Sequence, residues 1–230
     1  MGEMPLSSTS ADSPLLTDSV YQRLIEEIVD GKLAPGQRIR QAALAQRLGV
    51  SRAPISHALQ LLKQRELVRE SGKMGVEVAP ISSDRVRDLY QIRARLDGLA
   101  ARLTAARVKV GELRPTGIER LRRVFNAGAA TAANTPMSQQ VRADVAFHKE
   151  IYEICGNASI ATTMAPLWSH IARAMVLVLE AGAERHRAWG EHRAIMDAIL
   201  NSRPDEAEER AFLHAANAGV FTENRLRGTR

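Results

Sequence analysis

Apolar and polar residues alternate differently in the two parts of the chain. Up to about residue 80 the apolar positions fall in short groups separated by turn residues, whereas beyond it they follow long helical periods. Apolar residues spaced three and four apart lie on one face of a helix. The pattern predicts a mainly α protein with one domain over residues 15–80 and a second over residues 81–230. Residues 1–14, rich in serine and proline, are expected to be a disordered tail rather than a signal peptide.

Residues 41–68 predict two short helices joined by a tight turn, after a first helix over about residues 18–31. Gly49 is expected to end the earlier of the two, because glycine adopts the left-handed conformation at low cost. Ser51 suits the N-cap of the next helix, and Pro54 falls in its first turn, where the missing N–H is not needed. This arrangement is typical of a helix-turn-helix.

The second of these helices has one apolar face, formed by Ile55, Ala58, Leu59 and Leu62. Its other face is small and polar, and Arg52 stands at its N-terminal end. A helix of this kind can enter the major groove of DNA. The expected DNA-contacting residues on and around it are Ser51, Arg52, Ala53, Ser56 and His57.

A hairpin is predicted directly after the helix-turn-helix. Residues 67–68 and 76–78 read as strands, with a turn at residues 71–73 between them, so the domain is a winged helix. Arg40 and Lys73 are expected to add contacts to the DNA backbone. An ordinary three-helix bundle with a hairpin is the alternative, and the basic charge of the segment favours the DNA-binding interpretation.

Charge and composition support a polyanionic partner. The chain carries 32 Lys and Arg against 26 Asp and Glu, a net charge of +6, and between Arg38 and Lys73 the only acidic residues are Glu66 and Glu70. Aromatic residues make up only 4%, which disfavours binding by stacking on single-stranded bases. The single cysteine, Cys155, excludes an internal disulfide and fits a reducing cytoplasm, and no apolar run is long enough to span a membrane.

The first domain resembles the DNA-binding domain of GntR-family transcriptional regulators. The resemblance rests on Pro35-Gly36, Leu44-Ala45, Leu67-Val68 and a central motif made of Leu48-Gly49-Val50-Ser51-Arg52, Pro54, Ala58-Leu59 and Leu62. The chain departs from the family at Gln41, Ala53 and Ser56-His57, where Glu, Thr and Arg-Glu are usual. It therefore lacks an arginine that normally contacts phosphate or guanine.

The second domain is predicted to be an antiparallel bundle of six helices. Glycine, proline and serine positions give their approximate bounds, which are residues 83–108, 114–133, 138–155, 159–181, 184–201 and 205–224. Residues 127–136 are expected to fray or to form a loop.

Four polar residues of this bundle are expected to point into its core. Asp144 and His148 lie four apart and share a helical face with Ile151, while His192 and His214 share apolar faces of two other helices. Imidazole and carboxylate groups together suit a divalent transition metal. Ordinary buried histidines are the alternative, which four converging polar groups disfavour.

Arg93 is unusual because it lies on the apolar stripe of the helix over residues 83–108. Two interpretations stay open from the residues alone. One is an ion pair with Asp97, a turn further on, and the other is a cationic anchor inside a ligand cavity.

The second domain resembles the FCD ligand-binding domain of the FadR subgroup of GntR regulators. The matching positions are Arg93 and Asp97 (usually Glu), Asp144, Phe147-His148, Gly156-Asn157, His192 and His214. The resemblance implies a homodimer on a palindromic double-stranded DNA operator. It also implies a zinc, nickel or manganese ion held by the aspartate and three histidines, with a small organic-acid effector at its open positions and at Arg93.

The sequence therefore predicts a regulator, most simply a repressor, that is not an enzyme. Two alternatives from other classes are a DNA-binding dimer whose helical domain has no metal or effector role, and a metal-dependent hydrolase. Against the hydrolase, no nucleophile or base stands out beside the four candidate ligands, and Glu150 lies off their helical face.

Overall fold

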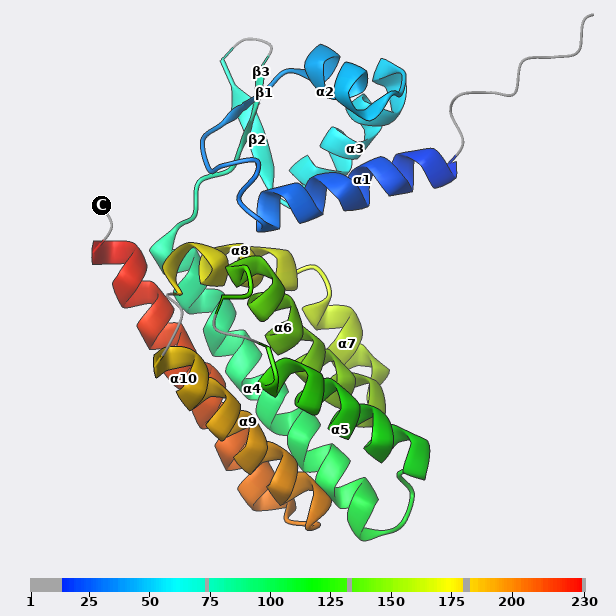
Figure 1. The fold of residues 1–230 in the computed structure, drawn as a ribbon, viewed down its shortest axis with the longest axis vertical. Helices are drawn as coiled ribbons and strands as arrows, with labels where there is room; N and C mark the ends of the chain where they lie inside the picture. The colour runs from blue at the N-terminus through cyan, green and yellow to red at the C-terminus, as the bar shows by residue number, and fades with distance from the viewer. Residues whose placement is uncertain (1–13, 73–74, 132–133, 180–182, 229–230) are drawn as a thin grey trace, which may run out of the picture. The chain divides into compact units, whose positions relative to one another are not determined.

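The structure is a computed structural model, and it describes residues 14–72, 75–131, 134–179 and 183–228. The chain forms two compact units, Met1–Pro80 and Ile81–Arg230. The architecture is mainly helical with one small sheet, as the apolar pattern predicts (Figure 1).

The described part of the first unit packs three helices against a three-stranded antiparallel sheet. Its elements are α1 (Pro14–Val29), β1 (Arg38–Ile39), α2 (Gln41–Leu48), α3 (Arg52–Gln64), β2 (Val68–Ser71) and β3 (Gly75–Val78). The strand order is β1-β3-β2, with Arg38 opposite Glu77 and Val68 opposite Val78. The predicted hairpin is present, and β1 adds an edge strand that sequence periodicity did not predict because it is only two residues long.

A continuous apolar core joins the helices of the first unit to the sheet. Leu24 of α1, Ile55 and Leu62 of α3, and Val78 of β3 are fully shielded from solvent. Helix α1 begins at Pro14, a turn earlier than the predicted Asp18, with proline at the helix start where it is tolerated.

The second unit is a bundle of seven helices in the described part of the chain. They are α4 (Ser83–Lys109), α5 (Pro115–Ala129), α6 (Met137–Ile154), α7 (Ala158–Met164), α8 (Trp168–Val178), α9 (Ala183–Leu200) and α10 (Pro204–Gly228). Helix α4 runs through the bundle and α10 packs along it in the opposite direction, with α9 beside α10 and α5 beside α6 (Figure 1).

The predicted single helix over residues 159–181 is wrong, and so is the count of six helices. The chain turns at residues 165–167, between α7 and α8. Pro166 lies in this turn and cannot donate the backbone hydrogen bond that a continuous helix requires. The start of α4 agrees with prediction, since the Ser82 side chain caps it by accepting a hydrogen bond from the Arg85 backbone N–H at 3.3 Å.

Candidate functional site

Helices α2 and α3 present a polar, basic face to solvent in the first unit. Arg52 and His57 of α3 are exposed, as are Ser51 and Ala53, whereas Ser56 is half-buried. The opposite face of α3 is buried, which fixes the orientation of the exposed side chains relative to the core. Arg40, exposed at the N-cap of α2, lies next to strand β1. Lys73 lies outside the described residues.

The turn between α2 and α3 follows the predicted chemistry in one respect and departs from it in another. Gly49 has φ +66° and its backbone N–H bonds back to the carbonyls of Ala45 and Gln46. Ser51 occupies the N-cap position of α3, but its side chain makes no capping hydrogen bond. The helix start is therefore held by the burial of Pro54 and Ile55 more than by the cap.

Buried Glu27 connects α1 to α2 behind this face. Arg47, at the end of α2, donates two hydrogen bonds to its carboxylate, Nη1 to Oε1 at 2.8 Å and Nη2 to Oε2 at 2.6 Å. Arg23 adds a third from α1 at 3.3 Å. The bond from Arg47 is the main reason why the pKa of Glu27 lies below its ordinary value despite burial.

In the second unit, three helices bring Asp144, His148, His192 and His214 together. All four are buried, and one ligand atom from each lies within 4.8 Å of the others. The Nε2 atom of His192 is 3.2 Å from that of His148, 3.1 Å from that of His214 and 3.4 Å from Asp144 Oδ1. The inward convergence expected from helical spacing is thus present in the fold.

Two further carboxylates orient two of these imidazoles from behind. Asp97 Oδ2 is 3.2 Å from His148 Nδ1, and Glu191 Oε2 is 2.7 Å from His214 Nδ1. Each carboxylate can accept an Nδ1 proton, and this contact turns the Nε2 atom of each ring toward the cluster. Tyr152 also donates its hydroxyl proton to Asp97 Oδ1.

Sequence reasoning missed Glu191 and Tyr152. Tyr152 lies four residues after His148 on α6, and this spacing is a signal that was available. Glu191 has no such signal, because it directly precedes His192 and its approach to His214 depends on how α9 packs against α10.

The donor set fits a divalent cation. Burial lowers the pKa of His148, and burial together with the neighbouring histidines lowers the pKa of His192 well below its ordinary value, so both rings are neutral and able to ligate. The Nε2 atom of His192 faces those of His148 and His214. Asp144 Oδ2 is buried without a hydrogen-bond partner among the described residues. A cation at the centre would satisfy these groups together.

Arg93 of α4 lies at the edge of this cluster. Its side chain is 1% exposed, its Nε donates to Asp97 Oδ2 at 3.1 Å, and its Nη2 donates to His148 Nε2 at 2.8 Å. Burial opposes ionisation of Asp97, but His148 and Arg93 hold the pKa of this carboxyl well below its usual range. Arg93 Nη1 has no hydrogen-bond partner within the described ranges.

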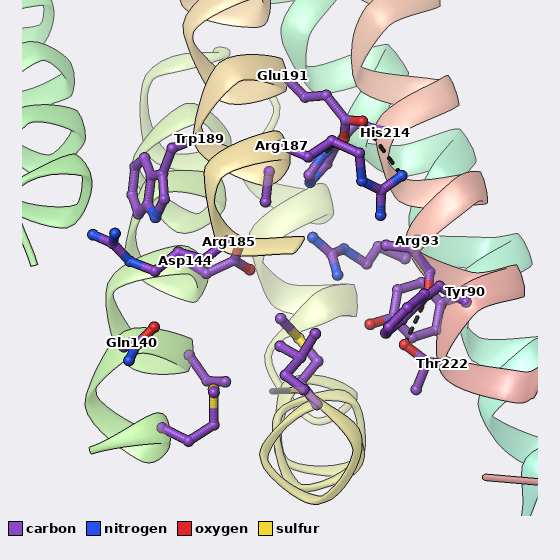
Figure 2. A pocket seen from close by; sticks show the side chains of 17 residues that line it. Tyr90, Arg93, Gln140, Asp144, Arg185, Arg187, Trp189, Glu191, His214 and Thr222 are labelled. Carbon is purple, nitrogen blue, oxygen red and sulfur yellow. Dashed lines mark hydrogen bonds and ion pairs between the residues drawn. The ribbon is translucent and has the colours of Figure 1, made fainter. Parts of the chain in front are cut away.

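A cavity of about 80 Å³ opens beside Asp144, His214 and Arg93. Figure 2 shows these residues on its wall together with Tyr90 and Thr222. The ion pair of Arg93 with Asp97 is present, and the same guanidinium lines the cavity, while its role as an anchor for a ligand stays a prediction.

Trp189 of α9 forms another part of the cavity wall and packs against α5. A Cβ atom at Gly128 of α5 would lie 1.9 Å from the Trp189 ring, so only glycine allows the tryptophan this position. Arg185 fastens the start of α9 to the end of α5, since its Nη2 donates to Thr131 Oγ1 at 2.7 Å and to the Ala129 carbonyl at 3.1 Å.

Comparisons with known families match both units. Residues 16–78 match "Bacterial regulatory proteins, gntR family", and residues 88–217 match "FCD domain". The described helices include none with both the length and the apolarity needed to cross a membrane.

Similar proteins cover most of the chain. An HTH-type transcriptional regulator from an unstable DNA locus of Streptomyces ambofaciens is 30% identical over 78% of this chain and 73% of its own. The HTH-type transcriptional repressor GlaR of Escherichia coli is 23% identical over 82% of this chain and 87% of its own. The solved structure of E. coli McbR/YncC has a TM-score of 0.77 at 17% identity, and covers 92% of this chain and 98% of that one.

Proposed function

This chain belongs to the GntR family of DNA-binding transcriptional regulators and carries an FCD domain, and from that premise we propose that it is a metal-dependent sensor of a small organic acid. The observation that supports this most directly is the cluster of Asp144, His148, His192 and His214, whose ligand atoms converge in the core of the bundle. The relative GlaR, which is named as a repressor, favours repression over activation.

When bound, a zinc, nickel or manganese ion would supply Lewis acidity for a carboxylate. Asp144, His148, His192 and His214 would hold the ion, with Asp97 and Glu191 fixing two of the rings. Arg93, whose Nη1 is unpaired within the described residues, would donate a charge-assisted hydrogen bond to the acid. Tyr90, Trp189 and Thr222 would surround the bound molecule.

Control of DNA binding follows from linkage between two sites. The acid changes operator affinity only to the extent that it binds one arrangement of the DNA-binding domains better than the other. A homodimer would place two copies of α3 on successive major grooves, so we propose a palindromic operator with half-sites about one helical turn apart. Arg40, Ser51, Arg52, Ala53, Ser56, His57 and Lys73 are the proposed DNA contacts.

The sensor proposal is tested by measuring metal, acid and operator binding on the same preparation. Wild-type protein purified without a histidine tag should retain about one metal ion per chain, and a bound acid should shift operator affinity roughly 5–150-fold. His192→Ala should lose both the metal and the shift. His186→Ala, an exposed histidine on the same helix, should keep both. Wild-type protein that binds no metal at micromolar concentration would rule the sensor out.

The DNA-binding proposal is tested at the N-terminal end of α3. Arg52→Ala should weaken operator binding by about 1–3 kcal/mol, because a contact to phosphate or guanine is lost. Lys63→Ala, at the other end of the same helix and paired with Glu70, is the matched control and should change affinity little. Fluorescence anisotropy at fixed salt measures both variants. Unchanged affinity in Arg52→Ala would remove this residue from the interface.

A further inference from the structure

We propose that the acid recognised by this cavity is a short monocarboxylate with a compact apolar body, and not a di- or tricarboxylate. This inference rests on the proposed function, because it takes the cavity beside Asp144 and His214 as the effector site. Its basis is the distribution of charged and apolar groups along the cavity wall.

Apolar side chains line the cavity on one side of the metal-ligand cluster. On α6, Val141 and Met137 precede Asp144 by three and seven residues, which is about 4.5 and 10 Å along the axis at ~1.5 Å per residue. On α10, Ala218 and Phe221 follow His214 by four and seven residues. Met175 of α8 and Leu179, directly after its end, also line the cavity. The end of the cavity away from the cluster is therefore largely hydrocarbon.

The polar groups at that end are neutral. Gln140 already donates its amide to the Thr135 carbonyl at 2.7 Å, and Thr222 donates its hydroxyl to the Ala218 carbonyl at 2.7 Å. Tyr90 lies beside Thr222 (Figure 2), and burial raises the pKa of its hydroxyl, which therefore stays protonated. None of these three side chains supplies a charge to balance a second carboxylate.

The three arginines that line the cavity each have a partner at the end of α5 or at the cluster. Arg185 donates through Nη2 to the Ala129 carbonyl and to Thr131 Oγ1 at the end of α5, and its Nε has no hydrogen-bond partner among the described residues. Arg187 pairs with Glu191 at 3.7 Å, and Glu191 contacts His214, so this pair sits at the cluster end. Arg93 Nη2 is 2.8 Å from His148 Nε2. It would therefore contact the carboxylate of the acid that the metal also binds.

A second carboxylate would thus be placed among Met137, Val141, Met175 and Phe221 without a cation. Burying an unpaired charge in such surroundings is strongly unfavourable. An apolar group at the same position gains from leaving water, and flexible methionine side chains adapt to its shape. The cavity volume of about 80 Å³ is roughly half of the ~150 Å³ that accommodates benzene, which favours a body of only a few carbon atoms.

The test compares acids of equal length that differ at the far end. Full-length protein is loaded with whichever of Zn²⁺, Ni²⁺ and Mn²⁺ it binds most tightly, and the acids are titrated by calorimetry. Butyrate should bind at least tenfold more tightly than succinate, and 2-hydroxybutyrate at least tenfold more tightly than malate. The second pair keeps an α-hydroxyl that can chelate the metal, so it tests the far end independently of chelation. Equal or tighter binding of succinate and malate would overturn the inference.

A substitution at the apolar end of the cavity should change the preference for monocarboxylates over dicarboxylates in a predictable direction. Met175→Lys places a cation at the apolar end and should raise the ratio of succinate to butyrate affinity at least tenfold. Leu177→Lys, exposed on the same helix, is the control and should leave the ratio unchanged. An unchanged ratio in a folded Met175→Lys protein contradicts the inference while leaving the sensor proposal intact. If the metal binds and none of the four acids does, acid sensing itself fails and this inference falls with it.

Discussion

At the scale of single residues, Arg93 links the candidate metal ligands to the cavity. Its guanidinium is held by Asp97 on one side and donates to His148 Nε2 on the other. The lone pair that accepts this hydrogen bond is the one that a metal ion would use. Arg93 therefore competes with a metal for His148, and its positive charge disfavours a second cation nearby.

Replacing this arginine should strengthen metal binding. We expect Arg93→Gln to raise metal affinity by roughly tenfold or more, because a charge near the ion and a competing donor are both removed. Competition against a fluorescent chelator measures the change. Arg95→Gln, an exposed arginine on the same helix, should bind metal like the wild type. Weaker metal binding in Arg93→Gln would show that the arginine supports the site instead.

Glu27 gives the first unit a predictable dependence on pH. Because the folded-state pKa of Glu27 is lowered, its contribution is fully present above the ordinary value of 4.5 and is lost as the pH falls through the folded-state pKa. Glu27→Gln should cost about 1.5–3 kcal/mol at pH 7, since hydrogen bonds to charged partners are removed. Urea unfolding followed between pH 7 and pH 3 should show the difference from wild type shrinking below pH 4.5. A constant difference would argue against an ionised Glu27 in the folded state.

The inward direction of Asp144, His148, His192 and His214 was predictable because each shares a helical face with apolar residues. Asp97 was within reach of the same reasoning through its spacing from Arg93. The contact of Glu191 with His214 could not be predicted in this way. The helical period places a residue on a face of its helix, but it does not say which neighbouring helix that face contacts. Metal binding by the four residues stays a prediction, as does DNA contact by the residues around Arg52.

At the scale of elements, periodicity located most helices to within a turn, and the errors have local causes. A continuous helix was expected over residues 159–181 because both halves are apolar at helical spacing, yet Pro166 separates α7 from α8. Strand β1 is too short to show alternation, and it forms only because β3 is available to pair with it. Such long-range pairing is not encoded in the local pattern.

The turn between α2 and α3 depends on a left-handed residue. Gly49→Ala should destabilise the first unit by about 1 kcal/mol, because a Cβ atom is strained at φ +66°. Gly190 of α9 is the matched control, since it is helical and has open space around it, so Gly190→Ala should be neutral or slightly stabilising. Chemical denaturation measures both. A neutral Gly49→Ala would mean that the turn adopts another conformation at little cost.

At the scale of the whole molecule, the DNA-binding elements and the candidate metal ligands fall in different compact units. Ligands that bind only one folded unit should stabilise that unit. Removing the metal with EDTA should therefore lower the melting temperature of the unit spanning Ile81–Arg230 and leave that of Met1–Pro80 unchanged. Calorimetry resolves the two unfolding transitions. Added operator DNA should raise the melting temperature of the DNA-binding unit and so identifies its transition. If EDTA changes neither melting temperature, the metal does not stabilise the second unit.

The contact between Gly128 and Trp189 has a consequence for how such a sensor changes during evolution. The tryptophan stands where it does because a methyl group is missing from α5, at a residue that does not itself line the cavity. A single codon change from glycine to alanine would displace the ring and reshape the cavity without altering any residue that lines it. Under the proposed function, descendants of this protein could therefore acquire a new effector through a position that a comparison of cavity-lining residues would overlook.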